Sequence, residues 1–157
     1  MKRLAKEIMR RDISFIKKEA KIDYILKKIK SSELKILMVI DDYNHPIGII
    51  TDTDILFKEA DLDFPNTYSL LGSIIFTNLS ETKDYKEKLR KEVAIDANNL
   101  MSKNLIMGDI NSTVHDICNL MINNNVSHIP IVNDDNEVIG IVTKKEIIEI
   151  IIDNYFD

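Results

Sequence analysis

Hydrophobic residues recur along this chain at two spacings, and each spacing predicts a different element. Isoleucine and leucine recur every three or four positions from about 21 to 31, which predicts a helix with one apolar face. Residues 36–40 and 47–50 form two continuous apolar runs of strand length. The segment between them, 41–46, is rich in Asp, Asn and Pro, which favour tight turns, so the two runs predict a hairpin.

Three further elements complete the pattern of this first region. Residues 3–9 predict a short helical lead-in, and residues 13–15 predict a brief strand. After Thr51 the chain passes directly into a helical pattern that ends near Ala60. The predicted order is therefore a lead-in followed by a strand, a helix, two strands and a helix.

The same order returns in the second half of the chain, from residue 97. Ile8–Leu56 aligns with Leu100–Ile148 without a gap, at a constant offset of 92 positions. The elements predicted there are a lead-in at 99–101, a short strand at 105–107, a helix along Val114 to Met121, strands at 129–132 and 138–142, and a helix from near Lys144. Nine aligned pairs are identical, namely Met9/Met101, Ile25/Ile117, Asp42/Asp134, Asn44/Asn136, Ile47/Ile139, Gly48/Gly140, Ile49/Ile141, Thr51/Thr143 and Ile55/Ile147. An internal duplication is the strongest structural signal in the sequence.

The duplication predicts an α+β fold built from two β-α-β-β-α repeats, each with a three-stranded sheet. A unit this small cannot bury both faces of its elements alone, so we expect the repeats to stack about a pseudo-twofold axis. The domains expected are a first motif at 1–60, an insert at 61–96 and a second motif at 97–157. Residues 57–96 hold half of the aromatic residues of the chain, which predicts that the insert folds. It could cap the core, contribute to a dimer contact or cover a ligand cleft, and packing is the role we favour.

Composition narrows the class of protein without naming a function. The formal net charge is −5, which gives no basic field for nucleic acid or an anionic membrane. The first residues lack the apolar core of a signal peptide, and the apolar run 147–152 is too short to span a bilayer. The single cysteine, Cys118, excludes an internal disulfide and fits a reducing compartment. We therefore expect a cytoplasmic protein.

The two segments Gly48–Asp54 and Gly140–Glu146 carry the candidate chemistry, because each turns from a strand directly into a helix. The first N–H groups of a helix and its dipole favour a phosphate. The Asp54 carboxylate suits the paired 2′ and 3′ hydroxyls of a ribose, and the hydroxyl groups of Thr51 and Thr143 can donate or accept. Thr-x-x-Asp and Thr-x-x-Glu are also capping boxes that need no ligand. Either motif alone favours capping, whereas two such corners facing one groove favour binding.

The chain resembles a tandem pair of cystathionine-β-synthase (CBS) domains, also called a Bateman module. The resemblance covers about 1–60 and 97–154, and the insert resembles that of small stand-alone bacterial members. It rests on Ala5-Lys-Glu-Ile-Met9, Gly48-Ile-Ile-Thr-Asp-Thr-Asp54, Ala97-Asn-Asn-Leu-Met101, His128-Ile-Pro-Ile-Val132 and Gly140-Ile-Val-Thr-Lys-Lys-Glu146. It implies a non-catalytic regulatory module that binds AMP, ADP, ATP or S-adenosylmethionine in the cleft between the motifs. It also implies a homodimer, with an unidentified protein partner possible and with no nucleic acid or membrane partner.

The resemblance also implies roles for particular residues. Asp54 would hold the ribose, Thr51 would bond ribose or phosphate, and Thr53 would lie on the phosphate side. In the second repeat Thr143 matches, Lys145 stands at the position of Thr53, and Glu146 departs from the usual aspartate, which puts that ribose site in doubt. Contacts to the base would come from Ser14, Lys35, Met38, Asn104, Leu105, Ile106, His128 and Pro130.

Other constellations are weaker. His115 and Cys118 have helical spacing, but no second pair of metal ligands is visible, so we expect a solvated histidine beside a buried structural thiol and no metal site. His128 could be a strand-edge imidazole or a phosphate contact that weakens as the pH rises past its pKa. The alternative to a nucleotide sensor is a structural interaction or dimerisation module without a ligand. We expect no enzyme, because no nucleophile–base pair or metal set is visible.

Overall fold

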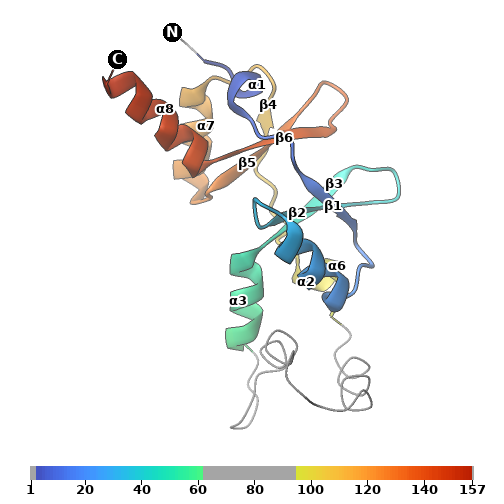
Figure 1. Cartoon of the computed structure of the whole chain (residues 1–157). Coiled ribbons are helices and arrows are strands. Elements are labelled where there is room, and N and C mark those ends of the chain that lie inside the picture. Colours follow the sequence, from blue (N-terminus) through green and yellow to red (C-terminus); the bar gives the residue numbers. More distant parts are fainter. Residues whose placement is uncertain (1–2, 62–94, 157) are drawn as a thin grey trace, which may run out of the picture. The chain divides into compact units, whose positions relative to one another are not determined.

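Two three-stranded sheets, one from each repeat, carry the fold (Figure 1). The structure is a computed structural model and describes residues 3–61 and 95–156. The first repeat comprises α1 (Ala5–Ile8), β1 (Ser14–Lys17), α2 (Ile22–Ser31), β2 (Ile36–Ile40), β3 (Pro46–Thr51) and α3 (Asp52–Asp61). The second comprises α6 (Ala97–Leu100), β4 (Gly108–Asp109), α7 (Val114–Asn124), β5 (His128–Val132), β6 (Val138–Thr143) and α8 (Lys144–Phe156). The predicted α+β class and the order of elements are confirmed.

The strand register repeats at the offset that the sequence alignment predicts. β1 pairs parallel with β2, with Ile16 opposite Val39, and β4 pairs parallel with β5, with Gly108 opposite Ile131. Both partners are shifted by 92 positions between the repeats. The central strand of each sheet is the one after the first long helix, in the orders β1-β2-β3 and β4-β5-β6. The duplication in sequence is therefore a duplication of hydrogen-bonded structure.

One short strand lies elsewhere than predicted. We expected it at 105–107, but residues 103–107 belong to no strand and β4 consists of Gly108 and Asp109 only. Two features explain the shorter pairing. Pro130, at the position of Met38, has no amide hydrogen to donate to the sheet. Ile106 packs against the apolar core of its unit instead of continuing the strand.

The tight turns that precede β3 and β6 are also duplicated. Asn44 and Asn136 are identical aligned residues, and both have left-handed backbone conformations, with φ of 65° and 62°. Asparagine tolerates this region better than most residues, because its short polar side chain can bond locally to the backbone. The hairpin turns predicted from the Asp and Asn content therefore form with the same chemistry in both repeats.

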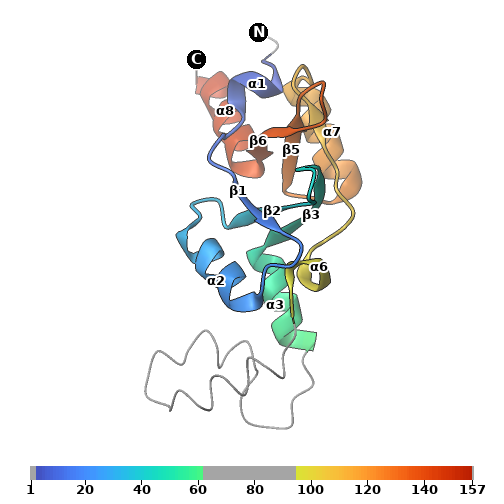
Figure 2. The same cartoon turned by 90° about the vertical axis from the view of Figure 1, so that its right-hand side faces the viewer.

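The lead-in helices are exchanged between the two cores. The described residues form two compact units, one of 14–42, 47–61 and 95–103 and the other of 3–13, 43–46 and 104–156. In the first unit Ala97 and Leu100 of α6 are buried with α2, β2 and β3 of the other repeat. In the second unit Ala5 of α1 and the following Met9 are buried with α7, β5 and β6 (Figure 2). Each core thus contains a segment that the other repeat contributes.

The predicted domain boundaries at 60 and 97 follow the repeats and remain a prediction. The insert at 61–96 lies almost entirely outside the described residues, so its predicted folding and its roles also remain predictions.

A glycine and a methionine fix each exchanged lead-in. A Cβ added to Gly48 would lie 2.3 Å from the sulfur of Met101, and one added to Gly140 would lie 2.3 Å from the sulfur of Met9. Neither glycine has a positive φ, so the requirement is for space and not for an unusual backbone. Beside these contacts the backbones bond in both directions, between Ile49 and Ser102 in the first unit and between Ile141 and Arg10 in the second.

We predict that Gly48→Ala destabilises the protein by about 1–3 kcal/mol, because the added methyl group overpacks the contact with Met101. Chemical unfolding measures the effect as a change in free energy. In a Met101→Ala background the same substitution should cost far less, since the space is then empty. An equal cost in both backgrounds would show that the methionine is not what the glycine accommodates.

Candidate functional site

The first strand-to-helix corner is a closed capping box with one carboxylate at its centre. Thr51 ends β3 and is buried, and Asp54 lies half-buried in the first turn of α3. The Thr51 amide and hydroxyl both donate to Oδ2 of Asp54, at 2.7 and 2.9 Å, and the Asp54 amide donates to the threonine hydroxyl at 3.4 Å. The capping that the motif predicts is therefore present. The capping box uses Oδ2 of Asp54 and makes no bond to the other carboxylate oxygen, Oδ1.

The second oxygen of Asp54 is contacted by a residue of the other repeat. The hydroxyl group of Ser102 donates to Oδ1 of Asp54 at 2.8 Å. Ser102 follows Met101 at the end of the exchanged lead-in, where its backbone bonds to Ile49 of β3. The lead-in thus delivers a hydroxyl group directly to the carboxylate of the first corner.

The rest of the first corner is acidic and exposed. Asp52 and Thr53 both lie at the surface, and the Thr53 amide donates to Oδ1 of Asp52 at 2.8 Å. Two carboxylates in the first turn satisfy the dipole of α3 from within the chain. This corner therefore suits uncharged hydroxyl groups better than it suits a phosphate.

The second corner has the same capping box with a different charge. The Thr143 amide donates to Oε2 of Glu146 at 2.8 Å, and the Thr143 hydroxyl donates to the same oxygen. Glu146 is buried, at 9% exposure. Lys144 and Lys145 are exposed in the first turn of α8, and Lys145 lies 3.9 Å from Glu149. The carboxylate here is more enclosed than Asp54, and the exposed groups around it are cationic.

Arg10 occupies the position in the second unit that Ser102 occupies in the first. Its backbone is bonded to Ile141 in both directions, as Ser102 is bonded to Ile49. Its guanidinium donates to both carboxylate oxygens of Asp12, at 2.9 and 2.6 Å. These bonds from Arg10 hold the pKa of Asp12 below its usual value of 3.8. The residue after the lead-in methionine is therefore an uncharged hydroxyl in one unit and a paired cation in the other.

The residues of the first repeat that are expected to contact a base lie in different environments. Ser14 is half-buried on β1 opposite Leu37, and Met38 is fully buried on β2 opposite Phe15. Lys35 is exposed, with a φ of 54°, and its ammonium donates to carbonyl oxygens at the end of α2, at 3.2 and 2.9 Å. Two of the three ammonium donors of Lys35 are therefore already used as a cap for that helix.

The corresponding residues of the second repeat gather more closely around their corner. His128 begins β5 directly opposite Thr143, and Pro130 is buried opposite Ile141. The His128 ring nitrogen Nδ1 lies 3.4 Å from the hydroxyl group of Ser127. Asn104 is exposed and Ile106 half-buried, both in the segment before β4. His128, Thr143 and Glu146 therefore meet within one unit.

Ser102 is the site residue that the sequence prediction missed. The repeat alignment pairs it with Arg10, and the two residue types share no chemistry, so the position gave no signal. The usable signal was positional, since Ser102 directly follows Met101, the last identical residue of the lead-in.

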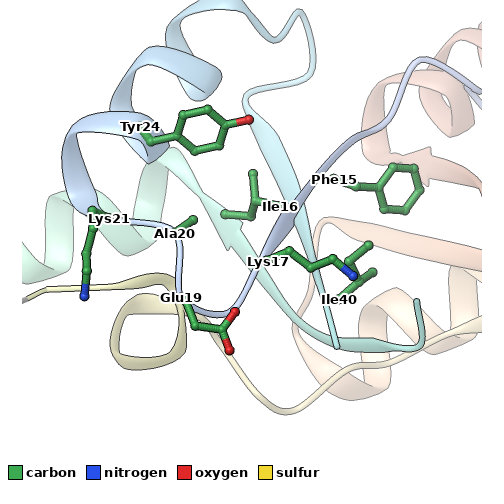
Figure 3. A pocket seen from close by; sticks show the side chains of 8 residues that line it. All are labelled: Phe15, Ile16, Lys17, Glu19, Ala20, Lys21, Tyr24 and Ile40. Atoms are coloured by element: carbon green, nitrogen blue, oxygen red, sulfur yellow. The ribbon is translucent and has the colours of Figure 1, made fainter. Parts of the chain in front are cut away.

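A shallow depression of about 520 Å³ lies beside β1 and α2 (Figure 3). Phe15 and Tyr24 are both exposed at its rim, and the Lys17 ammonium donates to the carbonyl of Asp41 at 2.6 Å. None of the residues to which the family resemblance assigns a ligand contact lines this depression.

The remaining reactive residues form no centre within the described part of the chain. Cys118 is partly buried on α7 and packs against the core of its unit, and burial raises the pKa of its thiol. No group of three His, Cys, Asp or Glu side chains lies together as a metal site among the described residues. None of the described helices is both long and apolar enough to cross a membrane.

Several solved structures share the fold over nearly the whole chain. The protein CBSX2 of Arabidopsis thaliana, solved in complex with AMP, has a TM-score of 0.68 at 17% identity and covers 97% of this chain and 98% of its own. The CBS domain pair of the protein MJ0100, in complex with 5′-methylthioadenosine and S-adenosyl-L-methionine, has a TM-score of 0.69 at 19% identity, with 98% and 99% covered. The cytosolic domain of the Mg²⁺ channel MgtE, in complex with ATP, has a TM-score of 0.63 at 11% identity. The match covers 94% of this chain and 48% of the MgtE chain.

Sequence relatives agree with these structures. An uncharacterized protein of Methanocaldococcus jannaschii is 25% identical, with 95% of this chain and 91% of the relative covered. A CBS domain-containing protein of Dictyostelium discoideum is also 25% identical, with 97% and 93% covered. The resemblance to bacterial members in particular remains a prediction.

The family assignment rests on two matches in one chain. The family model of the CBS domain matches residues 5–61 and again residues 96–153. The two matches fall on the two halves of the predicted duplication, and no catalytic family is indicated by them. The chain therefore belongs to the CBS domain family and carries its domain as a tandem pair.

Proposed function

We propose that this chain is a non-catalytic regulatory module that binds an adenine nucleotide or an adenosine derivative. In this proposal Asp54 holds the ribose, with Thr51 fixing its carboxylate, and ligand binding alters a dimer or a partner protein. The observation that carries the proposal is the half-buried Asp54 carboxylate, held at both oxygens at the start of α3. A preorganised acceptor of this kind suits a ligand with paired hydroxyl groups.

The complexes of structurally similar proteins support the class of ligand. Their ligands are AMP, ATP, 5′-methylthioadenosine and S-adenosyl-L-methionine, all of which contain adenosine. The acidic surroundings of the first corner favour ligands with few negative charges there. The proposal therefore places AMP and uncharged adenosine compounds ahead of ATP at this corner, in a cytoplasmic protein.

The second corner is the weaker candidate in this proposal. Glu146 is buried and accepts both bonds from Thr143, and it differs in length from an aspartate. Lys145 and His128 supply groups that could contact a phosphate, but the proposal assigns the ribose to Asp54 alone.

A structural interaction module without a ligand is the second candidate function. Its supporting observation is that both threonines and both acids already satisfy one another as capping boxes. A capping box completes a helix N-terminus without any ligand. The two candidates therefore differ in one measurable property, which is stoichiometric binding of an adenosine compound.

We predict that nucleotide-free protein is stabilised by at least one of AMP, ADP, ATP and S-adenosylmethionine. A ligand at ten times its dissociation constant should add about 1.4 kcal/mol to the free energy of unfolding. Thermal unfolding and titration calorimetry measure the effect. Asp54→Asn, which keeps the side-chain shape, should remove the stabilisation, whereas the matched change Glu146→Gln at the second corner should leave it largely intact.

Two results would decide against the proposal. Absence of binding for all four compounds, with protein shown to carry no nucleotide, would favour the structural module. Equal binding by the native protein and by Asp54→Asn would remove the ribose role from this corner.

We also propose that the chain forms a homodimer through α8. Ile148, Ile151, Ile152 and Tyr155 recur at helical spacing, and each is at least half exposed, with Tyr155 at 83%. Ile147 and Ile150 face the core on the other side of the helix. An apolar stripe of this kind on a regular helix is typical of a helix-to-helix contact.

We predict that Ile151→Glu weakens this dimer at least tenfold, because a charge would be desolvated in an apolar contact. Sedimentation analysis over a range of concentrations measures the dissociation constant. Ile122→Glu, an equivalent change at an exposed isoleucine of α7, serves as the control and should leave the dimer intact. A native protein that stays monomeric throughout would contradict the dimer proposal.

A further inference from the structure

The Asp54 carboxylate has fewer open acceptor positions than a ribose needs. A carboxylate offers about four lone-pair positions. Two on Oδ2 are used by the amide and hydroxyl of Thr51, and one on Oδ1 is used by the hydroxyl of Ser102. One position therefore remains, on Oδ1, whereas the 2′ and 3′ hydroxyls of a ribose together present two hydrogens.

The second acceptor is the Ser102 hydroxyl oxygen, which donates its hydrogen to Oδ1 of Asp54. The hydroxyl of Ser102 commits its only hydrogen to Asp54, so its two lone pairs are left to accept. Ser102 is exposed, whereas Asp54 is half-buried, so the serine oxygen is open to solvent. The two oxygens are 2.8 Å apart, which is close to the separation of two neighbouring ribose hydroxyl oxygens.

The backbone holds Ser102 in place independently of its hydroxyl group. The Ser102 amide donates to the carbonyl of Ile49 at 2.9 Å, and the Ile49 amide donates back at 3.1 Å. The preceding Met101 packs where Gly48 has no Cβ. The hydroxyl is therefore presented by an ordered segment of the sheet edge, as a preorganised acceptor requires.

We propose that Ser102 is a specificity-determining residue of this site, which accepts one ribose hydroxyl while Oδ1 of Asp54 accepts the other. The inference rests on the proposed function. It adds that a residue of the second repeat completes the ribose site of the first, and that the hydroxyl–carboxylate pair reads the presence of both ribose hydroxyls.

The second unit supplies an internal comparison. Arg10 takes the position of Ser102, with the same two backbone bonds to its sheet, but an arginine has no acceptor to offer. Its guanidinium is paired with Asp12 instead. Recognition of paired hydroxyl groups by this device therefore belongs to the first corner and not to the second.

Titration calorimetry with AMP and with 2′,3′-dideoxy-AMP tests the inference on the full chain. The native protein should bind AMP more tightly than the dideoxy compound. Ser102→Ala should weaken AMP binding roughly three- to tenfold, the equivalent of one lost hydrogen bond, and should leave binding of the dideoxy compound unchanged. Ser102→Thr, which keeps a hydroxyl group, should restore the preference for AMP.

The controls separate a ligand contact from a packing effect. Ser31→Ala removes a hydroxyl group that bonds only within α2 and should alter neither affinity. An equal loss for both compounds in Ser102→Ala would overturn the inference by showing that the serine is needed for structure. An unchanged affinity of Ser102→Ala for AMP would also overturn the inference. So would an increased affinity, because it would show that the serine competes with the ligand for Asp54.

Failure of this inference is distinguishable from failure of the proposed function. If the native protein binds AMP, and Asp54→Asn abolishes this binding whereas Ser102→Ala does not weaken it, the proposed function is retained and the role of Ser102 is rejected. Native protein that does not bind AMP overturns the inference, while the other three compounds of the panel decide separately on the function.

Discussion

The contact between a glycine of one repeat and the methionine of the other repeat's lead-in determines how this chain is organised. At Gly48 and Gly140 the sheet edge has no side chain, and the sulfurs of Met101 and Met9 occupy the space that a Cβ would need. Because the methionine side chain occupies the space beside the glycine, the backbone after it comes within hydrogen-bond distance of the strand. Each repeat is thereby completed by a segment that the other repeat contributes, and neither core is closed without it.

The composition of the two cores follows from this exchange. Leu100 is 4% exposed, and burying a side chain of its size is worth about 1.5–3 kcal/mol relative to leaving it in water. That free energy is available only when the lead-in docks on the core of the partner repeat. The exchange thus makes the stability of each unit depend on residues of the other repeat, which a single small repeat could not achieve.

Periodicity and the internal repeat were sufficient to predict most of the fold. The long helices have dense apolar patterns and the hairpins have turns rich in Asp and Asn, and local forces determine both. The prediction of a short strand at 105–107 was wrong, because strand pairing there depends on Pro130, in another strand, and on the packing of Ile106. The exchange of the lead-ins was beyond sequence reasoning for a similar reason, since α1 and α6 are four residues long and carry no signal for which core they join.

The candidate site shows the same limit. The threonine and the acid of each corner lie within four residues, so the motif predicts their contact directly. Ser102 is 48 residues from Asp54, and its role depends on a docking event that the pattern does not encode. Long-range partners of a predicted residue are therefore the part of a site that the structure adds.

A gap-free duplication need not give two equivalent sites, and the chemistry at this chain's two corners explains why. The backbone bridge after each lead-in methionine is the same, so the duplicated fold delivers one side chain to each corner. At the first corner that side chain is a serine, and its hydroxyl extends the acceptor surface of Asp54. At the second it is an arginine, held by Asp12 beside a corner that also carries Lys144 and Lys145. The two corners therefore differ in charge at several aligned positions, with Arg10 for Ser102, Lys144 for Asp52 and Lys145 for Thr53, while the backbone bridge and the strand register stay the same.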